Sequence, residues 1–518
     1  MMPAVRQQSG VSLHTLLEGL VDSPVLAAVA HLSVNGITQD SRQTEAGDMF
    51  IALSGMASHG LQYAEQAVEA GAAVVLWDAA GGNEKELIDA LSDRALCLQV
   101  EDLQLKTSEI AARFYHHPSR ELKLIGITGT DGKTSVSHYL AQCLHTAASP
   151  CGVLGTLGNG LVDALTPTGL TTASAVQVQK SLADLVEKGA TWAAMEVSSH
   201  GLDQGRVSGV SFDTAVFTNL SQDHLDYHKT LDAYFEAKSK LFQMAGLRSA
   251  VINLDDEFGR ILARQYNKQL TVYGYSLLPD IEPLADYADH IVHTESIKPT
   301  RHGFEINVAT PVGSGYVELP LLGRFNVANA LAVLATLLVN HVSLEQALER
   351  LHLIKPVAGR MVLIEAASGP TVIVDYAHTP QGLVAACQAA RQHFTGELWC
   401  VFGCGGDRDR DKRPLMAQAA EQVADHVIVT SDNPRHEEPQ AIIEQIVNGF
   451  ARPAVVATSV ERREAIAYAI TQAADEDVVL LAGKGHETCQ LVGDRCIDFD
   501  DRKVVRELLS AADTGAAG

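Results

Sequence analysis

The sequence lacks the features that mark several classes of protein. It has 39 Lys and Arg against 63 Asp and Glu, and a formal net charge of −24. This charge excludes binding to nucleic acid or to an anionic membrane through bulk positive charge. The most apolar stretch, residues 327–339, contains Asn329 and is too short to span a bilayer. Because no charged segment followed by an apolar run opens the chain, we expect no secretion signal and a cytoplasmic protein.

The cysteines also lack the spacing that would indicate a metal site. The eight cysteines are scattered, and Cys400 and Cys404 form a CxxxC without any zinc-type spacing around it. We therefore expect unpaired structural cysteines in a reducing compartment. The acidic balance does not exclude an anionic small substrate, which local basic residues can hold.

The length of 518 residues exceeds what a single core normally organises and predicts about three domains. We place them at residues 1–105, 106–354 and 355–518. No repeat or low-complexity segment interrupts this division. The expected fold class is α/β throughout: a small N-terminal domain, a central parallel-sheet domain and a C-terminal doubly wound, Rossmann-like domain.

The first domain alternates short helices and strands. Residues 11–20 and 63–70 predict helices, whereas residues 36–42, 47–53 and 73–77 predict strands with polar turns. Ser41 and Ser58 lie in such turns, where they could contact a ligand. Taken alone, serines in these positions are more often simply turn residues.

Residues 122–135, LKLIGITGTDGKTS, predict a strand, a glycine loop and a helix. Glycines let backbone N–H groups approach a polyphosphate, the helix N-terminus adds partial positive charge, and Lys133 neutralises phosphate oxygens. Thr134 offers a hydroxyl to Mg²⁺. The spacing GxxGxxGKT differs from the usual phosphate loop, and a chance glycine-rich turn is the alternative. The strand–loop–helix context favours an ATP site.

Three further features of the central domain can each be interpreted in two ways, as part of a functional site or as ordinary structure. Glu196 ends an apolar strand, where it can hold Mg²⁺ or simply face solvent. His224 and His228 are four residues apart, as on one helical face, but no third zinc ligand is evident. Lys238, on a helix predicted over 233–242, is ordinarily a solvated lysine.

Beyond residue 355, apolar runs of strand length alternate with helical patterns. The runs at 371–374, 398–402, 426–430 and 478–481 each precede a polar loop. In a doubly wound parallel sheet such loops lie together at the carboxyl ends of the strands. Four charged loops at one edge indicate a site for a zwitterionic molecule, with a solvated sheet edge as the alternative. They are DYAH at 375–378, GGDRDRDKR at 405–413, DNPR at 432–435 and GKGHE at 483–487.

Taken together, these stretches resemble the Mur ligases, the ATP-dependent amide-forming enzymes of peptidoglycan precursor synthesis. The resemblance covers nearly the whole chain. The motifs that carry it are DSR at 40–42, TGTDGKTS at 128–135, TT at 171–172, MEVSSHGL at 195–202, TNLSQDHLDYH at 218–228, EAK at 236–238, FNVAN at 325–329, GRM at 359–361, VDYAHTP at 374–380, GCGGDRDRDKRP at 403–414, DNPR and GKGHE.

The resemblance implies a ligase that adds meso-2,6-diaminopimelate to UDP-N-acetylmuramoyl-L-alanyl-D-glutamate, using ATP and two Mg²⁺ ions. The catalytic residues it implies are Lys133, Glu196, His224 and Lys238. Of these, Lys238 matches a family lysine that CO₂ carbamylates to N6-carboxylysine. The implied metal ligands are Thr134, Glu196, His224 and the Lys238 carbamate. The implied ATP-binding residues are Gly129, Thr130, Asp131, Gly132, Lys133, Thr134, Ser135, Asn326, Asn329, Arg360 and Asp375.

The same resemblance implies the other two substrate sites. For the UDP-muramoyl dipeptide it points to Ser41, Ser58, Thr171, Thr172, Ser198, Gln204 and Arg206. For diaminopimelate it points to Arg408, Asp432, Asn433, Pro434, Arg435, Gly483 and Glu487. An arginine can grip the second α-carboxylate that distinguishes diaminopimelate from lysine. The expected partners are these small molecules alone, with no nucleic acid and no membrane span, and we expect a monomer.

Asp131 departs from the family pattern, which more often has Asn there. A further negative charge near phosphates is unfavourable, so Asp131 either points away from them or meets Mg²⁺. Leu170, Ser135 and Asp411 are smaller departures. None removes a predicted catalytic position.

Rival functions remain at this point. A folylpolyglutamate synthase-like enzyme or the next Mur ligase of the pathway would share the same chemistry, but DSR, DNPR and GKGHE argue against both. A lysine-adding ligase is a further alternative, against which a carboxylate-binding Arg435 argues. A nucleotide-binding switch or transporter ATPase would need the glycine loop and not the charged C-terminal loops.

Overall fold

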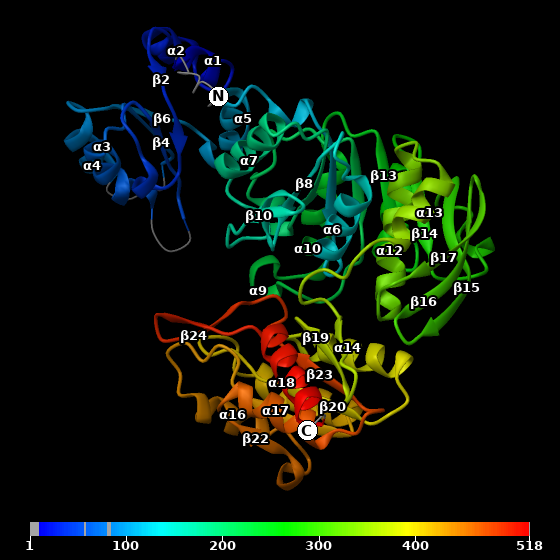
Figure 1. Ribbon diagram of the computed structural model, residues 1–518. Coiled ribbons are helices and arrows are strands. Elements are labelled where there is room, and N and C mark those ends of the chain that lie inside the picture. Colours follow the sequence, from blue (N-terminus) through cyan, green and yellow to red (C-terminus); the bar gives the residue numbers. More distant parts are fainter. Residues whose placement is uncertain (1–9, 56–58, 80–83, 517–518) are drawn as a thin grey trace. The chain divides into compact units, whose positions relative to one another are not determined.

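The computed structural model describes residues 10–55, 59–79 and 84–516, which form two compact units (Figure 1). The first runs to Tyr275 and includes residues 282–291 and 335–341, and the second contains residues 276–281, 292–334 and 342 onwards. Among the described helices, none is both long and apolar enough to cross a membrane.

The first unit opens with a small parallel sheet in the order β3-β4-β5-β6. Apolar side chains on the two faces of these strands, such as Ile51 and Phe50, belong to separate cores. The predicted helix over 11–20 is wrong at its start, because Val11 and Ser12 pair with Val34 and Ser33 as a strand. The elements are β1 (Val11–Ser12), α1 (Leu13–Leu17), α2 (Ser23–Val29), β2 (Ser33–Val34), β3 (Ile37–Thr38), β4 (Met49–Ala52), α3 (Ala64–Glu69), β5 (Val74–Trp77), α4 (Glu84–Leu91), β6 (Leu96–Gln99) and α5 (Leu103–Phe114).

The part of the larger sheet that lies in this unit has the order β10-β9-β8-β11-β7-β12-β13-β14. Strand β7 lies between β11 and β12 and is parallel to both, so all three carboxyl ends meet at one edge. This order brings the glycine loop, Glu196 and Thr218 together. The strands are β7 (Lys123–Thr128), β8 (Cys151–Gly155), β9 (Gly158–Leu161), β10 (Ala164–Thr166), β11 (Trp192–Glu196), β12 (Thr214–Phe217), β13 (Ser249–Asn253) and β14 (Thr271–Ser276).

The helices between these strands follow the predicted pattern with two corrections. The helix expected over 233–242 ends at Ser239 and continues as a 3₁₀ turn. His224 and His228 do not share a helical face. His224 lies just before a helix of four residues, and its own backbone is in the left-handed conformation, with φ +53°. The helices are α6 (Lys133–Leu144), α7 (Ala175–Glu187), α8 (Ser199–Asp203), α9 (Leu225–His228), α10 (Leu231–Ser239) and α11 (Glu257–Tyr266).

The second unit contains an antiparallel arrangement that the sequence did not predict. In it β16 pairs with both β15 and β17. The elements are β15 (His290–Thr300), whose first two residues belong to the first unit, β16 (Gly303–Thr310), β17 (Gly313–Leu319), α12 (Arg324–Val339), whose residues from 335 onwards belong to the first unit, and α13 (Leu344–His352).

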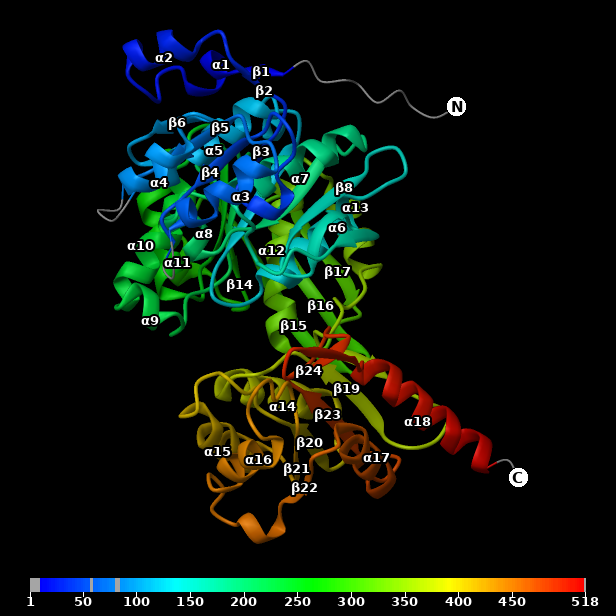
Figure 2. The same ribbon diagram turned by 90° about the vertical axis from the view of Figure 1, so that its left-hand side faces the viewer.

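The predicted doubly wound sheet is present in the second unit, with the order β18-β19-β23-β20-β21-β22. Neighbouring residues along a strand, such as Cys400 and Val401, point into separate cores. Helices α14–α16 cover one face and α17–α18 the other, as Figure 2 shows. The elements are β18 (Val362–Ile364), β19 (Thr371–Asp375), α14 (Pro380–His393), β20 (Leu398–Phe402), α15 (Lys412–Val423), β21 (His426–Thr430), α16 (Pro439–Val447), β22 (Ala457–Ser459), α17 (Arg462–Gln472), β23 (Val478–Ala482) and α18 (Asp501–Ala516).

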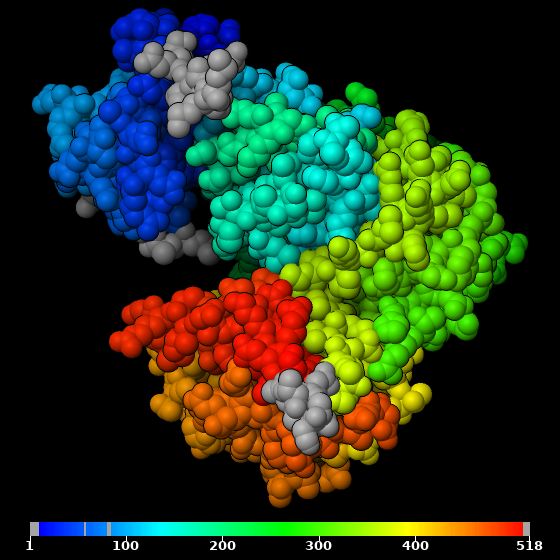
Figure 3. Space-filling view, in the orientation of Figure 1, coloured from blue at the N-terminus to red at the C-terminus, as the bar shows by residue number. Residues whose placement is uncertain are grey.

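A short antiparallel hairpin follows the GKGHE loop: β24 (Cys489–Val492) and β25 (Arg495–Asp498). A disulfide joins Cys489 to Cys496 across it, which corrects the expectation that all cysteines are unpaired. The six other cysteines, all in the described part of the chain, form no disulfide. The last part of the chain, red in Figure 3, forms a continuous stretch of the surface of this unit.

Candidate active site

The glycine loop lies between β7 and α6, and the side chain of Lys133 folds back onto carbonyl groups of the loop. Gly132 caps α6 with φ +82°, a conformation that favours glycine. Lys133 Nζ donates to the carbonyl oxygens of Gly129 at 2.9 Å and Thr130 at 2.7 Å. The loop therefore presents a helix N-terminus and a lysine ammonium at one place, which is an arrangement suited to phosphate.

Asn219, which follows strand β12, holds Asp131 through hydrogen bonds to the Asp131 main chain. The Asp131 N–H donates to Asn219 Oδ1 at 2.9 Å, and its carbonyl accepts from the Asn219 side-chain amide at 3.3 Å. The Asp131 side chain is exposed. The residue thus orders the loop through its backbone, which places no demand on the identity of its side chain.

Glu196, at the end of β11, is fully buried and does not face solvent. Its Oε2 accepts from Thr134 Oγ1 at 2.9 Å and from Thr156 Oγ1 at 3.0 Å, while its Oε1 accepts from the Thr156 N–H at 2.9 Å. Burial raises the pKa of this carboxyl, and these hydrogen bonds together with Lys133 oppose the shift. A buried carboxylate beside a threonine hydroxyl of the phosphate loop is a hard-oxygen donor set that fits Mg²⁺.

Several residues predicted for the muramoyl dipeptide lie directly beside Glu196. Thr172 Oγ1 donates to the Glu196 carbonyl at 3.0 Å and accepts from the Ser198 N–H at 2.9 Å. Arg206 Nη1 donates to the Thr172 carbonyl at 2.6 Å, and Arg206 Nη2 donates to Gln204 Oε1 at 2.7 Å. These four predicted residues therefore share one hydrogen-bonded network with the candidate metal ligand.

The remaining predicted residues of that group are placed as follows. Thr171 Oγ1 lies 3.0 Å from Thr156 Oγ1, so it joins the same network. Ser41 is buried and donates to Gln66 Oε1 at 2.8 Å within the small sheet domain. Ser58 lies outside the described residues.

Lys238 is buried, which overturns the interpretation of a solvated lysine. Its side chain is 1% exposed, and its Nζ donates to the Gly129 carbonyl at 2.7 Å. The Nζ also lies 4.3 Å from the centre of the Tyr234 ring. Burial, with a contribution from Lys133, lowers the pKa of Lys238 well below its ordinary value. Two lysines thus meet at one carbonyl of the phosphate loop.

The two histidines have different surroundings. His228 is buried and its Nε2 lies 2.9 Å from Ser199 Oγ, whereas His224 is about half exposed. The His224 ring lies 5.0 Å from that of His200. Within the described residues no group of three or more His, Cys, Asp or Glu could hold a metal ion, so the zinc interpretation gains no support.

The residues predicted for the adenosine part of ATP lie in the second unit. Asn329 Nδ2 donates to Asn326 Oδ1 at 3.1 Å, and Asn326 Nδ2 donates to the Leu322 carbonyl at 2.8 Å, so both buried amides have hydrogen-bond partners. Asp375 accepts from the N–H groups of Met361 and Ala377, each at 2.8 Å, and burial raises its pKa. The Arg360 guanidinium lies 4.7 Å from the centre of the Tyr376 ring.

The DNPR and GKGHE loops meet at the carboxyl ends of β21 and β23. Asn433 Nδ2 donates to Glu487 Oε2 at 2.8 Å. Asp432 is buried, and burial raises the pKa of its carboxyl. A Cβ on Gly483 would lie 2.5 Å from Asp432 Oδ2, so only glycine fits there without displacing that side chain. Pro434 is buried beside them.

Two arginines flank Gly405 next to this group. Arg435 has φ +49°, and its Nη1 donates to the Gly406 carbonyl at 2.9 Å. The Cβ position of Gly405 lies 2.8 Å from Arg435 Nη1 and 3.7 Å from Arg408 Cγ. Arg408 is exposed and Arg435 partly buried, so both can reach an anionic group.

Sequence reasoning missed three residues of these networks. Thr156 bonds both oxygens of Glu196, and no sequence signal marks it. Tyr227, within the motif TNLSQDHLDYH, donates to Asp203 Oδ2 at 2.9 Å and accepts from Gln204 Nε2 at 3.5 Å. Lys484, inside GKGHE, is fully buried and bonds Glu487. The motif marks the loop as functional, but a lysine in a charged loop does not by itself indicate burial.

Three family profiles match the chain: "Mur ligase family, catalytic domain" at residues 33–115, "Mur ligase middle domain" at 127–337 and "Mur ligase, glutamate ligase domain" at 359–485. The chain belongs to the Mur ligase family. Its fold is the three-domain α/β fold of that family, and the protein is a ligase.

Several Mur ligases align with almost the whole chain. A UDP-N-acetylmuramoyl-L-alanyl-D-glutamate–2,6-diaminopimelate ligase of Alkalilimnicola ehrlichii is 47% identical over 96% of this chain and 98% of its own length. The protein of the same name from Coxiella burnetii is 44% identical over 95% and 99%. A solved structure of a ligase with this name shares 35% identity and a TM-score of 0.69, covering 97% of this chain and 99% of that one.

A more distant solved structure agrees in fold. MurF from Acinetobacter baumannii is 20% identical, with a TM-score of 0.64, and the match covers 97% of this chain and 99% of that chain. At this identity the likeness concerns the fold alone.

Proposed function

We propose that this Mur ligase adds meso-2,6-diaminopimelate to UDP-N-acetylmuramoyl-L-alanyl-D-glutamate with consumption of ATP. The observation that carries the proposal is the identity of 42–47% to relatives of that name over 94–96% of the chain. The charged loops that such a substrate requires are present and hydrogen-bonded to one another. The reaction would belong to peptidoglycan precursor synthesis in the cytoplasm.

The chemistry begins from a carboxylate, which is a poor acyl donor. The D-glutamyl γ-carboxylate attacks the γ-phosphorus of ATP, the bond to ADP breaks, and an acyl phosphate forms. The amine of diaminopimelate then attacks the acyl carbon, loses a proton, and phosphate leaves. The first step brings anions together, so it requires positive charge around the phosphates. Lys133 and the N-terminus of α6 supply it in the geometry described.

The donor set of Thr134 and Glu196 fits Mg²⁺, with His224 as a further ligand. Two Mg²⁺ ions, when bound, neutralise charge on the phosphate oxygens. Glu196 is held for that role by Thr156, which keeps the carboxylate oriented while it is buried.

Lys238 is proposed to act as its carbamate, formed with CO₂. Carbamylation requires the neutral amine, and the buried surroundings that lower the pKa of Lys238 favour that form. The carbamate turns a cation beside another lysine into an anionic ligand for the second Mg²⁺. This removes the repulsion between Lys238 and Lys133 at the Gly129 carbonyl.

We assign the acyl substrate to the network beside Glu196, that is to Thr171, Thr172, Ser198, Gln204 and Arg206. Because Thr172 bonds the Glu196 main chain, a peptide held there would place its carboxylate near the proposed metal. The assignments of Ser41 and Ser58 to the uridine end, and of Asn326, Asn329, Arg360 and Asp375 to ATP, remain predictions.

Diaminopimelate carries an α-amino carboxylate at each end, whereas lysine carries only one. Arg435 and Arg408 would bind the distal carboxylate, and Asp432, Asn433 and Glu487 its ammonium group. An arginine left without its carboxylate when lysine binds would disfavour lysine strongly. A lysine-adding ligase is the alternative that this site disfavours.

The function is tested by incubating the protein with the UDP-muramoyl dipeptide, ATP, Mg²⁺ and either diaminopimelate or lysine. Mass spectrometry should show one added diaminopimelate residue and equimolar ADP. Formation of the lysine adduct at a comparable rate would favour the alternative.

A further inference from the structure

Lys484 is an unusual residue for a charged loop. Its side chain is fully buried in the second unit, at the carboxyl end of β23. Its Nζ donates to Glu487 Oε2 at 2.9 Å, to the Cys489 carbonyl at 2.8 Å and to Asn433 Oδ1 at 3.2 Å. All three N–H bonds of the ammonium are therefore used within the protein.

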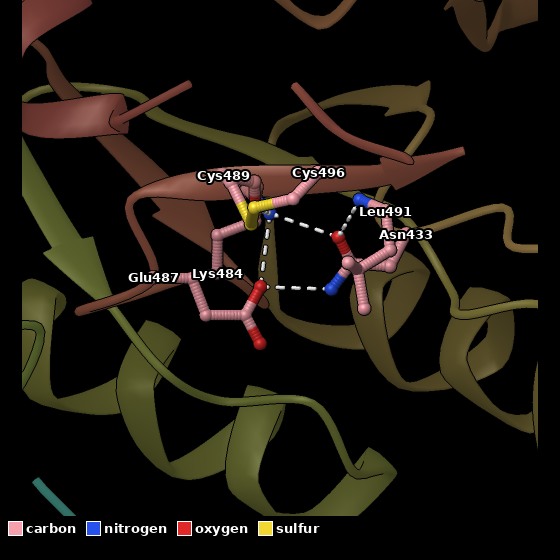
Figure 4. The surroundings of a disulfide bond; sticks show 6 residues. All are labelled: Asn433, Lys484, Glu487, Cys489, Leu491 and Cys496. Atoms are coloured by element: carbon pink, nitrogen blue, oxygen red, sulfur yellow. Dashed lines mark hydrogen bonds and ion pairs between the residues drawn. A yellow bond between two sulfur atoms is a disulfide. The ribbon is translucent and has the colours of Figure 1, made fainter. Parts of the chain in front are cut away.

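The lysine closes a ring of three side chains, which Figure 4 shows. Asn433 Nδ2 also donates to Glu487 Oε2, at 2.8 Å. Asn433 Oδ1 accepts a second bond from the Leu491 N–H at 2.9 Å. Since each end of the Asn433 amide has a defined partner, its orientation is fixed. The Glu487 carboxylate is likewise held by one oxygen, through two donors.

The second oxygen of Glu487 points away from Lys484 and Asn433 in Figure 4. The Glu487 side chain is 29% exposed, whereas Lys484 is not exposed at all. Within the described part of the chain, both bonds of this carboxylate fall on Oε2. The arrangement leaves Oε1 accessible to an ammonium group from outside.

The ring is tied to the neighbouring hairpin and to Arg435. Lys484 bonds the Cys489 carbonyl, and Asn433 bonds Leu491, both in β24. The Arg435 N–H donates to the Leu491 carbonyl at 2.9 Å. Lys484 thus connects the loop that carries Glu487 with the loop that carries Asn433 and Arg435.

We propose that Lys484 is a positioning residue for the incoming amino acid, holding Glu487 and Asn433 in the orientation that receives the ammonium group of diaminopimelate. Lys484 itself does not touch the substrate, because it is fully enclosed. This assignment rests on the proposed function, and it adds a residue to the acceptor site that the resemblance did not indicate.

The alternative is that Lys484 only stabilises the fold. The two roles differ in what they change. Loss of a fold-stabilising pair lowers the fraction of folded protein and affects all substrates equally. Loss of a positioning residue raises KM for diaminopimelate in the folded enzyme and leaves KM for ATP and for the UDP-muramoyl dipeptide unchanged.

Lys484→Met keeps the length of the side chain and removes its charge and its donors. We expect KM for diaminopimelate to rise about tenfold or more, the size expected when hydrogen bonds to a charged group are lost. The other two KM values should stay within about twofold of wild type. Steady-state ADP release, measured with each substrate varied in turn, gives all three values.

Arg391→Met is the matched control. Arg391 also bonds one carboxylate, that of Asp425, and one carbonyl, that of Val423, but it lies away from the proposed site. It should leave KM for diaminopimelate unchanged. An unchanged KM for diaminopimelate in folded Lys484→Met, or an equal rise in all three KM values, would overturn the proposal.

If Lys484→Met does not fold, Lys484→Ala prepared with n-propylammonium chloride decides the question. The added amine should occupy the space of the missing ammonium and lower KM for diaminopimelate as its concentration rises. A KM that is independent of the amine contradicts the proposal. Wild-type protein that forms no diaminopimelate adduct would instead refute the proposed function, so the two failures are distinguishable.

Discussion

Lys238 is the residue whose surroundings differ most from what its type suggests. A lysine that is 1% exposed and bonded to the same carbonyl as Lys133 is unfavourable as a cation. The low pKa that follows makes the amine available for carbamylation. The glycine loop, Lys133 and Lys238 are connected through the Gly129 carbonyl, to which both lysines donate.

Lys238→Ala should lose most of the activity, at least about 100-fold in kcat, because a proposed metal ligand is removed. A short carboxylic acid such as acetate, added to this variant, should restore part of it by replacing the carbamate. Initial rates of ADP formation measure both effects. Lys298→Ala, which removes an exposed lysine of β15 that is paired with Glu305, serves as control and should stay near wild type. Full activity in Lys238→Ala would contradict the carbamate role.

Arg435 carries the predicted preference for diaminopimelate over lysine. Arg435→Ala should reduce the ratio of kcat/KM values for the two amino acids by about 100-fold, since the distal carboxylate loses its partner. Competition between the two amino acids in one reaction, read by mass spectrometry, measures the ratio. Arg410→Ala removes an exposed arginine of the adjoining loop and should leave the ratio unchanged. A strong preference retained by Arg435→Ala would refute this role.

At the scale of elements, a buried ion pair joins α17 to α18 and contacts the carboxyl end of the interior strand β23. Arg462 and Asp501 are both fully buried, 2.7 Å apart, and Arg462 Nη2 also donates to the Ala482 carbonyl at the end of β23. The pair therefore connects two helices with the strand that precedes GKGHE.

Arg462→Ala should lower the free energy of unfolding of the second unit by about 3–5 kcal/mol, because it leaves Asp501 buried without its partner. Arg463→Ala breaks an exposed pair with Glu507 on the same two helices and should cost less than about 1 kcal/mol. Chemical denaturation of both variants tests this. Equal effects of the two substitutions would show that burial is not decisive here.

The β24–β25 hairpin is the element whose stability depends on a covalent bond. Replacing Cys489 and Cys496 by serine should destabilise the second unit by about 2 kcal/mol, the chain-entropy estimate for so short a loop. A reducing agent should lower the unfolding midpoint of wild type and leave that of the double-serine variant unchanged. A midpoint of wild type that does not respond to reductant would mean that these thiols are not paired in solution.

Helices and strands with a buried face could be predicted from the sequence, because burial imposes an apolar pattern on their residues. The strands at 398–402 and 426–430 agree with β20 and β21, since strands buried between two helix layers consist of apolar residues. The hairpin β24–β25 was missed because its residues are mostly exposed and show no apolar pattern. The disulfide was missed because it depends on the register of that hairpin.

The candidate site was predictable where a motif combines with the end of a strand, as at Lys133 and Glu196. Contacts made across the fold were not predictable. Thr156 has no motif, and the left-handed conformation of His224 contradicts the helical spacing that was read from His228. Burial of Lys238 and Lys484 depends on packing from several elements, which a single sequence does not reveal.

At the scale of the whole molecule, two compact units share the predicted chemistry. The first carries the phosphate loop, the donor set at Glu196 and the network around Thr172. The second carries the loops proposed for the amino acid. The proposed function requires both sets of residues in one reaction with a single acceptor, diaminopimelate.

The most direct test combines both amino acids with the UDP-muramoyl dipeptide, ATP and Mg²⁺ in one reaction and resolves the products by mass. We expect the diaminopimelate adduct in excess over the lysine adduct by about 100-fold or more, with one ADP released for each bond formed. A dominant lysine adduct, or ADP release without any adduct, would contradict the proposed function.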